Sequence, residues 1–124
     1  MNQRVLLVED DADARDALAL LLASQGYELE TAADGNAALT KAATFRPDVL
    51  ICDWMLPGEH DGVAVARLIQ DSSGIPIIFV TAHSLPELRN RTKDLHVYAY
   101  LPKPIDVVRL RSALAALARG SPPS

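Results

Sequence analysis

Residues 49–53 read Val-Leu-Ile-Cys-Asp, four apolar residues in a row followed at once by a carboxylate. Unbroken apolarity over so short a stretch, rather than an alternation of apolar and polar residues, is typical of a strand that is buried on both faces. Such strands occur in parallel sheets that carry helices on both sides. The stretch therefore predicts a central strand of a parallel sheet, with Asp53 at its carboxyl end.

Other segments extend this pattern along the chain. Short apolar runs at residues 5–8, 77–80 and 98–101 predict three more buried strands, and the alternating residues 27–32 predict a weaker fifth strand. Apolar residues at helical spacing predict helices between and after them. The helices are centred on residues 14–22 (ended by Gly26), 36–44, 65–69 (between Gly62 and Gly74), 85–95 and 107–117 (capped by Asp106).

Strand and helix therefore alternate five times. This order predicts an α/β fold with a five-stranded parallel sheet, helices on both faces and right-handed crossovers. For five strands we expect the flavodoxin-like (βα)5 arrangement with strand order 2-1-3-4-5. Its ligand crevice lies beyond the carboxyl ends of the first and third strands.

The bulk properties fit one domain, which we place at residues 1–119, with 120–124 as a tail or the start of a linker. A net charge of −4 predicts no direct nucleic acid binding. No apolar run is long enough to cross a bilayer, and no signal peptide opens the chain, so no membrane association is expected. The single cysteine, Cys52, excludes an internal disulfide and favours a cytoplasmic location.

Polar side chains follow four of the predicted strands at the edge where the crevice is expected. In strand order they are Glu9-Asp10-Asp11, Asp53, Thr81 and Lys103. Several carboxylates in one crevice repel each other unless a cation lies between them. Mg²⁺ is the expected ion, because it takes one or two protein carboxylates together with phosphate oxygens.

This arrangement suits phosphoryl transfer to a carboxylate. Mg²⁺ offsets the repulsion between the Asp53 carboxylate and an anionic phosphoryl group. The hydroxyl of Thr81 and the ammonium group of Lys103 are placed to hold the remaining phosphoryl oxygens. The pattern predicts Asp53, Thr81 and Lys103 as the residues that carry the chemistry.

Five segments together resemble the response-regulator receiver family (CheY-like, two-component signalling) over residues 4–118: residues 6–11, 53–57, 61–62, 80–82 and 100–104. The resemblance implies a signalling domain, not a turnover enzyme, that takes part in its own phosphorylation and dephosphorylation. A histidine kinase or histidine phosphotransfer protein would donate the phosphoryl group from a phosphohistidine. An attached kinase or effector domain is consistent with the same resemblance.

The resemblance also implies roles for single residues around the metal. Asp53 matches the phosphoacceptor, Asp10 matches a Mg²⁺ ligand, and Glu9 matches its partner, acting mainly through water. Met55 would offer its backbone carbonyl to the metal. One departure is that three residues, Gly58, Glu59 and His60, separate Pro57 from Asp61-Gly62 where the family usually has two.

A second set of implied roles concerns switching. Thr81 matches the switch hydroxyl, Tyr100 the switch aromatic and Lys103 the lysine of the family motif. The Lys103–Pro104 peptide bond would be cis, as is usual there. We expect phosphorylation to be read out on the face formed by the fourth helix, the fifth strand and the fifth helix.

Several neighbouring residues have simpler interpretations. Cys52 is expected to be an inert buried thiol, and Trp54 a partly exposed aromatic beside the site. Arg89 and Arg91 are expected on the solvated face of the fourth helix. Asp11 and Asp13 are both candidate caps of the first helix, and for Asp13 capping is the favoured interpretation.

Three other functions are less consistent with these residues. A phosphatase of the haloacid dehalogenase type needs an acid two residues after its nucleophile, where this chain has Met55. A flavodoxin needs a phosphate cradle after the first strand, where Glu9, Asp10 and Asp11 would repel the ligand. An interaction domain that has lost phosphorylation would lack one of the acidic, hydroxyl or lysine residues, and none is missing.

Overall fold

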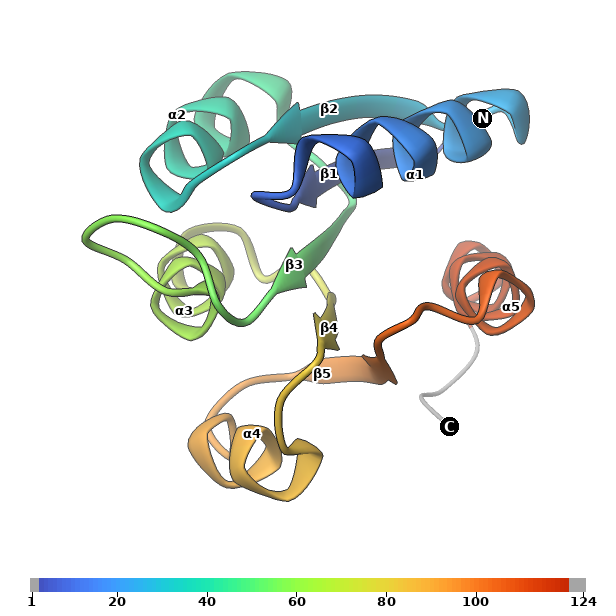
Figure 1. Ribbon diagram of the computed structural model, residues 1–124. Coiled ribbons are helices and arrows are strands. Elements are labelled where there is room, and N and C mark those ends of the chain that lie inside the picture. The colour runs from blue at the N-terminus through green and yellow to red at the C-terminus, as the bar shows by residue number, and fades with distance from the viewer. Residues whose placement is uncertain (1–2, 121–124) are drawn as a thin grey trace.

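The structure is a computed structural model that describes residues 3–120, so most of the predicted tail, residues 121–124, lies outside the described residues. Five parallel strands form one sheet in the order β2-β1-β3-β4-β5, which confirms the predicted fold (Figure 1). The strands are β1 (Arg4–Val8), β2 (Glu28–Ala32), β3 (Val49–Asp53), β4 (Ile77–Thr81) and β5 (Val97–Pro102).

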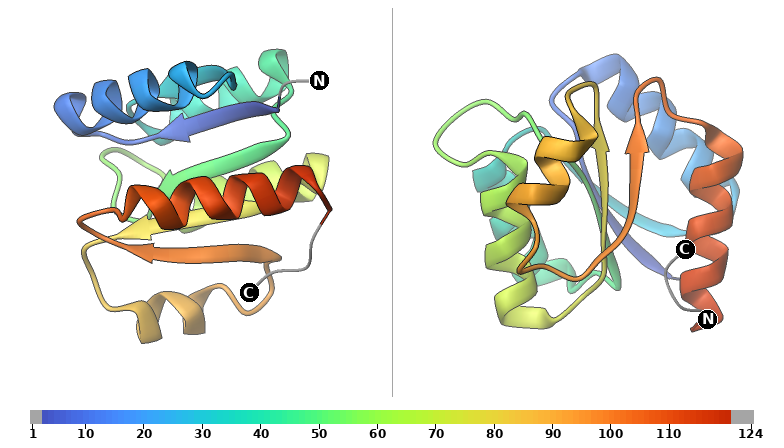
Figure 2. Two further views of the ribbon diagram at one scale, coloured as in Figure 1. Left: turned by 90° about the vertical axis from the view of Figure 1, so that its right-hand side faces the viewer. Right: turned by 90° about the horizontal axis from the view of Figure 1, so that it is seen from below.

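Helices cover both faces of this sheet. They are α1 (Ala12–Ser24), α2 (Gly35–Phe45), α3 (Gly62–Ser73), α4 (Leu85–Arg91) and α5 (Val107–Ala118). α1 and α5 lie on one face, whereas α2, α3 and α4 lie on the other (Figures 1 and 2). Each crossover therefore carries one helix, as expected for parallel strands.

The core is split into two layers by the sheet. Leu50 and Phe79 point toward α2, α3 and α4, whereas their neighbours Ile51 and Ile78 point toward α1 and α5. All four side chains are buried. Because successive residues of a strand point to opposite faces, burial of both faces requires the unbroken apolar runs seen in the sequence.

Helix starts are set by short polar side chains. The carboxylate of Asp11 caps α1 by accepting hydrogen bonds from the backbone N–H groups of Asp13 and Ala14, at 3.0 and 3.3 Å. The prediction that Asp13 is the cap is therefore wrong; it lies in the first turn, where its negative charge faces the positive end of the helix. Asp106 caps α5, as predicted.

α4 is shorter than the apolar spacing indicates. The predicted helix reaches Leu95, but α4 ends at Arg91, and Thr92 is its C-cap. A turn follows, in which the Leu95 backbone N–H donates to the Thr92 carbonyl at 3.0 Å. Leu95 still packs against the core, so its apolar character reflects burial from a turn rather than from a helix.

None of the helices within residues 3–120 is long and apolar enough to cross a membrane.

Candidate functional site

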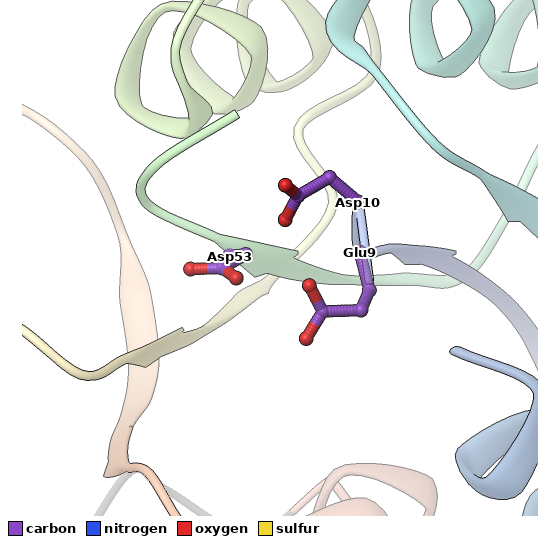
Figure 3. A group of neighbouring side chains, drawn as sticks. All are labelled: Glu9, Asp10 and Asp53. Carbon is purple, nitrogen blue, oxygen red and sulfur yellow. The ribbon is translucent and has the colours of Figure 1, made fainter. Parts of the chain in front are cut away.

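Three carboxylates meet at the carboxyl ends of β1 and β3. Glu9 and Asp10 follow β1 directly, and Asp53 is the last residue of β3. Because β1 and β3 are neighbours, one oxygen from each carboxylate lies within 4.8 Å of the others (Figure 3). The predicted juxtaposition of these three residues is therefore present in the fold.

Two of the carboxylates are buried and share one cation. Glu9 is 3% exposed and Asp53 is 6% exposed, and a buried carboxylate is costly without a partner. The Lys103 ammonium group lies 2.7 Å from Glu9 Oε1 and 2.6 Å from Asp53 Oδ2. Lys103 therefore bridges both buried groups, across 94 and 50 residues of sequence.

The environment of Lys103 favours its charged form. Partial burial alone would lower its pKa, but the hydrogen bonds to Asp53 and Glu9, with the attraction of their charges, outweigh that effect and raise the pKa. The Lys103 backbone N–H donates to the Thr81 carbonyl at 2.8 Å, which fixes the lysine beside the end of β4. The Lys103–Pro104 peptide bond is cis, as predicted.

The charges of the cluster suit a divalent cation. Within residues 3–120 the exposed Asp10 carboxylate has no hydrogen-bond or ion-pair partner, and one ammonium group faces three carboxylates. Oxygen ligands with excess negative charge are what Mg²⁺ binds in proteins. Met55 is 43% exposed and lies two residues after Asp53, and its role as a carbonyl ligand stays a prediction.

The loop after β3 returns tightly onto the site. The Gly62 backbone N–H donates to the Trp54 carbonyl at 2.6 Å. A Cβ atom at Gly62 would lie 1.9 Å from the Asp53 carbonyl oxygen, so no other residue fits this backbone. This role of Gly62 was not predicted, although the Asp61-Gly62 pair before a helix is visible in the sequence.

The loop between β3 and α3, which contains Gly58, Glu59 and His60, follows a defined path. It arches outward before it reaches α3 (Figure 1). Gly58 has a φ of 92°, and His60 packs against the start of α2, where a Cβ at Gly35 would lie 3.0 Å from His60 Cβ. The additional residue therefore extends the loop against α2.

The two predicted switch residues bind other groups rather than each other. Thr81 is 1% exposed, and its hydroxyl accepts a hydrogen bond from the His83 backbone N–H at 2.9 Å. Tyr100 stacks on Phe79 with ring centroids 6.2 Å apart, and its hydroxyl lies 2.6 Å from Thr92 Oγ1. Their switching roles stay predictions.

The prediction for Trp54 is wrong, whereas Arg89 and Arg91 are exposed on α4, as predicted. Trp54 is 2% exposed, and its ring meets His83 edge-on at 6.1 Å. Arg91 lies 5.7 Å from the Trp54 centroid, and Arg89 lies 4.3 Å from that of Tyr100. Both arginines also connect α4 to aromatic rings beside the site through cation–π contacts.

Cys52 is a buried free thiol, as predicted. Burial, and then the negative charges of Asp53, Asp61 and Glu9, raise its pKa. Its thiol therefore stays protonated and unreactive at neutral pH.

The chain matches known proteins over most of its length. A model of the response regulator receiver domain matches residues 5–115. The DNA-binding response regulator MtrA of Mycolicibacterium paratuberculosis is 34% identical over 119 residues, which cover 92% of this chain and 52% of MtrA. This chain thus spans about half the length of the curated relatives it matches.

Solved structures agree with this match. The signal receiver domain of a modulated diguanylate cyclase from Desulfovibrio desulfuricans is 33% identical, with a TM-score of 0.85 over 93% of this chain and 92% of that one. A CheY-like receiver domain protein from Methanospirillum hungatei has a TM-score of 0.90 at 24% identity, over 97% and 96% of the two chains. The latter likeness supports the fold alone.

The prediction of no direct nucleic acid binding is wrong. It rested on the net charge of −4 of these 124 residues. The relative MtrA is a DNA-binding response regulator, and this chain matches only about half of it. The charge of one domain carries no information about the binding properties of a longer protein that contains it.

Proposed function

Because this chain belongs to the response regulator receiver domain family, we propose that Asp53 accepts the phosphoryl group and that Glu9, Asp10 and Asp53 hold Mg²⁺. Receiver domains of two-component systems are signalling modules, and phosphorylation of an aspartate is their general function. The observation that carries the assignment to Asp53 is its position. It ends the strand beside the acidic pair, and its carboxylate accepts a hydrogen bond from Lys103.

The chemistry follows from the contacts of Asp53. Transfer from a phosphohistidine breaks a P–N bond, returns its electron pair to the imidazole and forms a P–O bond to an Asp53 carboxylate oxygen. Bound Mg²⁺ would offset the repulsion between this carboxylate and the incoming phosphoryl group. The Lys103 ammonium group is already 2.6 Å from Asp53 Oδ2, so its positive charge can stabilise the negative oxygens of the transferred group.

Thr81 completes the proposed site. It lies at the end of β4, and β4 pairs with β3 directly beside Asp53. Its hydroxyl can leave the His83 backbone N–H and donate to a phosphoryl oxygen. We also propose that the aspartyl phosphate is hydrolysed at this site, which would limit the lifetime of the signal.

Partners follow from the same proposal. A histidine kinase or histidine phosphotransfer protein would be the donor, which fits a cytoplasmic location. In a longer protein the domain would control an attached effector, and the relative MtrA makes a DNA-binding effector the first candidate. The face formed by α4, β5 and α5 would carry the signal, because Tyr100 of β5 and Arg89 of α4 are in contact there.

Phosphorylation by acetyl phosphate with Mg²⁺, measured as intact mass, tests the acceptor. The parent chain should gain one phosphoryl group, and Asp53→Asn should gain none. Thr81→Ala is a matched control that keeps the acceptor, and it should be phosphorylated more slowly. A phosphoryl group on Asp53→Asn, located by peptide mapping at another carboxylate, would refute the assignment.

Titration with Mg²⁺ tests the metal site, using the fluorescence of the single tryptophan, Trp54, which is buried one residue from Asp53. Asp10→Asn should weaken Mg²⁺ binding at least about tenfold, because it removes the one carboxylate with no protein partner. Asp13→Asn, an acidic residue of the first turn of α1, serves as the control. Equal Mg²⁺ affinity in Asp10→Asn and the parent would place the ion elsewhere.

A further inference from the structure

Thr92 is a buried polar residue with no role in the proposed phosphoryl transfer. It is 1% exposed and forms the C-cap of α4. Its hydroxyl oxygen lies 2.8 Å from the Leu88 carbonyl and 2.6 Å from the Tyr100 hydroxyl. A buried hydroxyl with two short partners at a helix end links α4 to β5.

The direction of these hydrogen bonds follows from the number of protons. A carbonyl can only accept, so the single hydroxyl proton of Thr92 is donated to Leu88. Thr92 Oγ1 then has only lone pairs to offer Tyr100, and the Tyr100 phenol must be the donor. The chain Tyr100 to Thr92 to Leu88 is thus a directed pair of bonds that ends in the last turn of α4.

Tyr100 is held on three sides. Its hydroxyl is bound to Thr92, one ring face stacks on Phe79, and the Arg89 guanidinium lies 4.3 Å from the ring centroid. The stacking and the cation–π contact act on the ring, whereas within residues 3–120 only the Thr92 bond fixes the hydroxyl. Any rotation of the ring that carries the hydroxyl away from α4 must break the Thr92 bond.

We propose that Thr92 is a positioning residue that holds Tyr100 against α4 in the unphosphorylated conformation and so sets how readily the domain switches. This inference rests on the proposed function, in which phosphorylation of Asp53 is read out on the face formed by α4, β5 and α5, and it adds that Tyr100 moves. The bond exists in the unphosphorylated conformation and is lost in the other. Removing it favours the switched conformation and tightens the binding of any ligand that selects that conformation.

Beryllofluoride in the presence of Mg²⁺ is the probe, because it stands in for a phosphoryl group on a carboxylate. Thr92→Val keeps the shape of the side chain and removes the hydroxyl, whereas Thr92→Ser keeps the hydroxyl. One neutral hydrogen bond corresponds to about a fivefold change in an equilibrium constant. Thr92→Val should therefore bind beryllofluoride about fivefold more tightly than the parent, and Thr92→Ser should match the parent.

A double-mutant cycle separates the link to Tyr100 from the link to Leu88. In a Tyr100→Phe background the phenol is absent, so Thr92→Val should no longer change the beryllofluoride affinity. Loss of the Leu88 bond is common to both backgrounds and cancels in the cycle. An equal effect of Thr92→Val in both backgrounds, or no effect in either, would overturn the inference.

A measurement on the parent chain covers the case in which Thr92→Val does not fold. The NMR signals of the Thr92 methyl group and the Tyr100 ring should both move when beryllofluoride is added, because their bond breaks. If both signals stay in place while Asp53 and its neighbours shift, phosphoryl acceptance by Asp53 stands, whereas the read-out through Tyr100 and the role of Thr92 both fail. If the parent does not bind beryllofluoride at all, the proposed function fails and the inference with it.

Discussion

Two helices follow the two strands that carry the proposed chemistry, and they are held in different ways. α3 comes after β3 and Asp53, has 12 residues and buries five of them. α4 comes after β4 and Thr81, has seven residues and buries one, Leu88. The strands before them are equally buried, so the contrast lies in the helices alone.

This difference separates the parts of the molecule that are fixed by packing from those that can move. α3 is fixed by apolar burial and by the close backbone contact at Gly62. α4 is held mainly by single contacts to rings beside the site, through Arg89, Arg91 and Thr92. Elements with few buried apolar contacts have low local stability, and switching elements are drawn from them.

The largest effect is expected at the start of α3. Gly62→Ala places a Cβ 1.9 Å from the Asp53 carbonyl oxygen, so the backbone of the acceptor must move. We expect a loss of about 4 kcal/mol in the free energy of unfolding, measured by urea denaturation. Gly58→Ala, in the same loop but with open space around it, should cost only about 1 kcal/mol, from its positive φ. Equal losses would contradict the close contact.

Truncation of one buried side chain in each helix sharpens the comparison. Ile69 of α3 is 3% exposed and Leu88 of α4 is fully buried. Ile69→Ala should lower the free energy of global unfolding by about 3 kcal/mol. Leu88→Ala should lower the free energy of global unfolding by less. Because α4 can open locally while the rest of the domain stays folded, its packing contributes little to the free energy of global unfolding. A larger loss for Leu88→Ala than for Ile69→Ala would show that α4 is fixed by packing as firmly as α3.

Hydrogen exchange tests the same contrast without a substitution. The backbone amides of α4 should exchange at least about tenfold faster than those in the middle of α3, because they open locally. Mass spectrometry of peptides covering residues 62–73 and 85–91 would measure both rates in one sample. Equal protection of the two helices would contradict the lower local stability of α4.

The smallest effect is expected at the exposed hydrogen bonds that link α3 to α4 and to the turn after it. Arg67 of α3 binds Asp94 through Nε at 2.8 Å and donates to the Arg91 carbonyl at 3.3 Å. The hydrogen bond from Arg67 lowers the pKa of Asp94 below its ordinary value of 3.8. A carboxylate with a lowered pKa contributes stability above its unfolded pKa and loses that contribution as the pH falls through its folded value.

Asp94→Asn should therefore be slightly less stable than the parent at neutral pH, and the two stabilities should converge below about pH 3.8. Thermal melting between neutral and acid pH measures the difference. Glu87→Gln, which removes the exposed ion pair with Arg91 inside α4, is the control for a pair that does not reach α3. A difference between Asp94→Asn and the parent that grows toward low pH would contradict the sign.

The sequence by itself was sufficient for the fold and for the acidic part of the site. Strands buried on both faces need continuous apolar runs, and such runs are visible without any structure. Parallel strands end at one edge, so Glu9, Asp10 and Asp53 had to converge once the strand order was known. Apolar runs, and the polar residues that directly follow them, involve only residues close in sequence, so both can be recognised without a structure.

The burial of Trp54 is indicated by a local pattern in the sequence. Leu50, Cys52 and Trp54 are alternate residues, and all three belong to the core layer beneath α2, α3 and α4. The period of two continues one residue beyond β3, which predicts burial of Trp54. Net charge, in contrast, was the wrong signal for nucleic acid binding, because it averages over one domain only.

Only the tertiary structure decided the remaining contacts. Lys103 meets Glu9 across 94 residues of sequence. The hydrogen bond between Tyr100 and Thr92 depends on where α4 ends. Gly62 is required because a Cβ atom there would lie 1.9 Å from the Asp53 carbonyl oxygen. Each contact is a distance between segments that packing brings together, and a difference of 1 Å makes or removes it. Sequence patterns specify which residues are buried and on which edge they lie, whereas distances of this precision follow only from the packed fold.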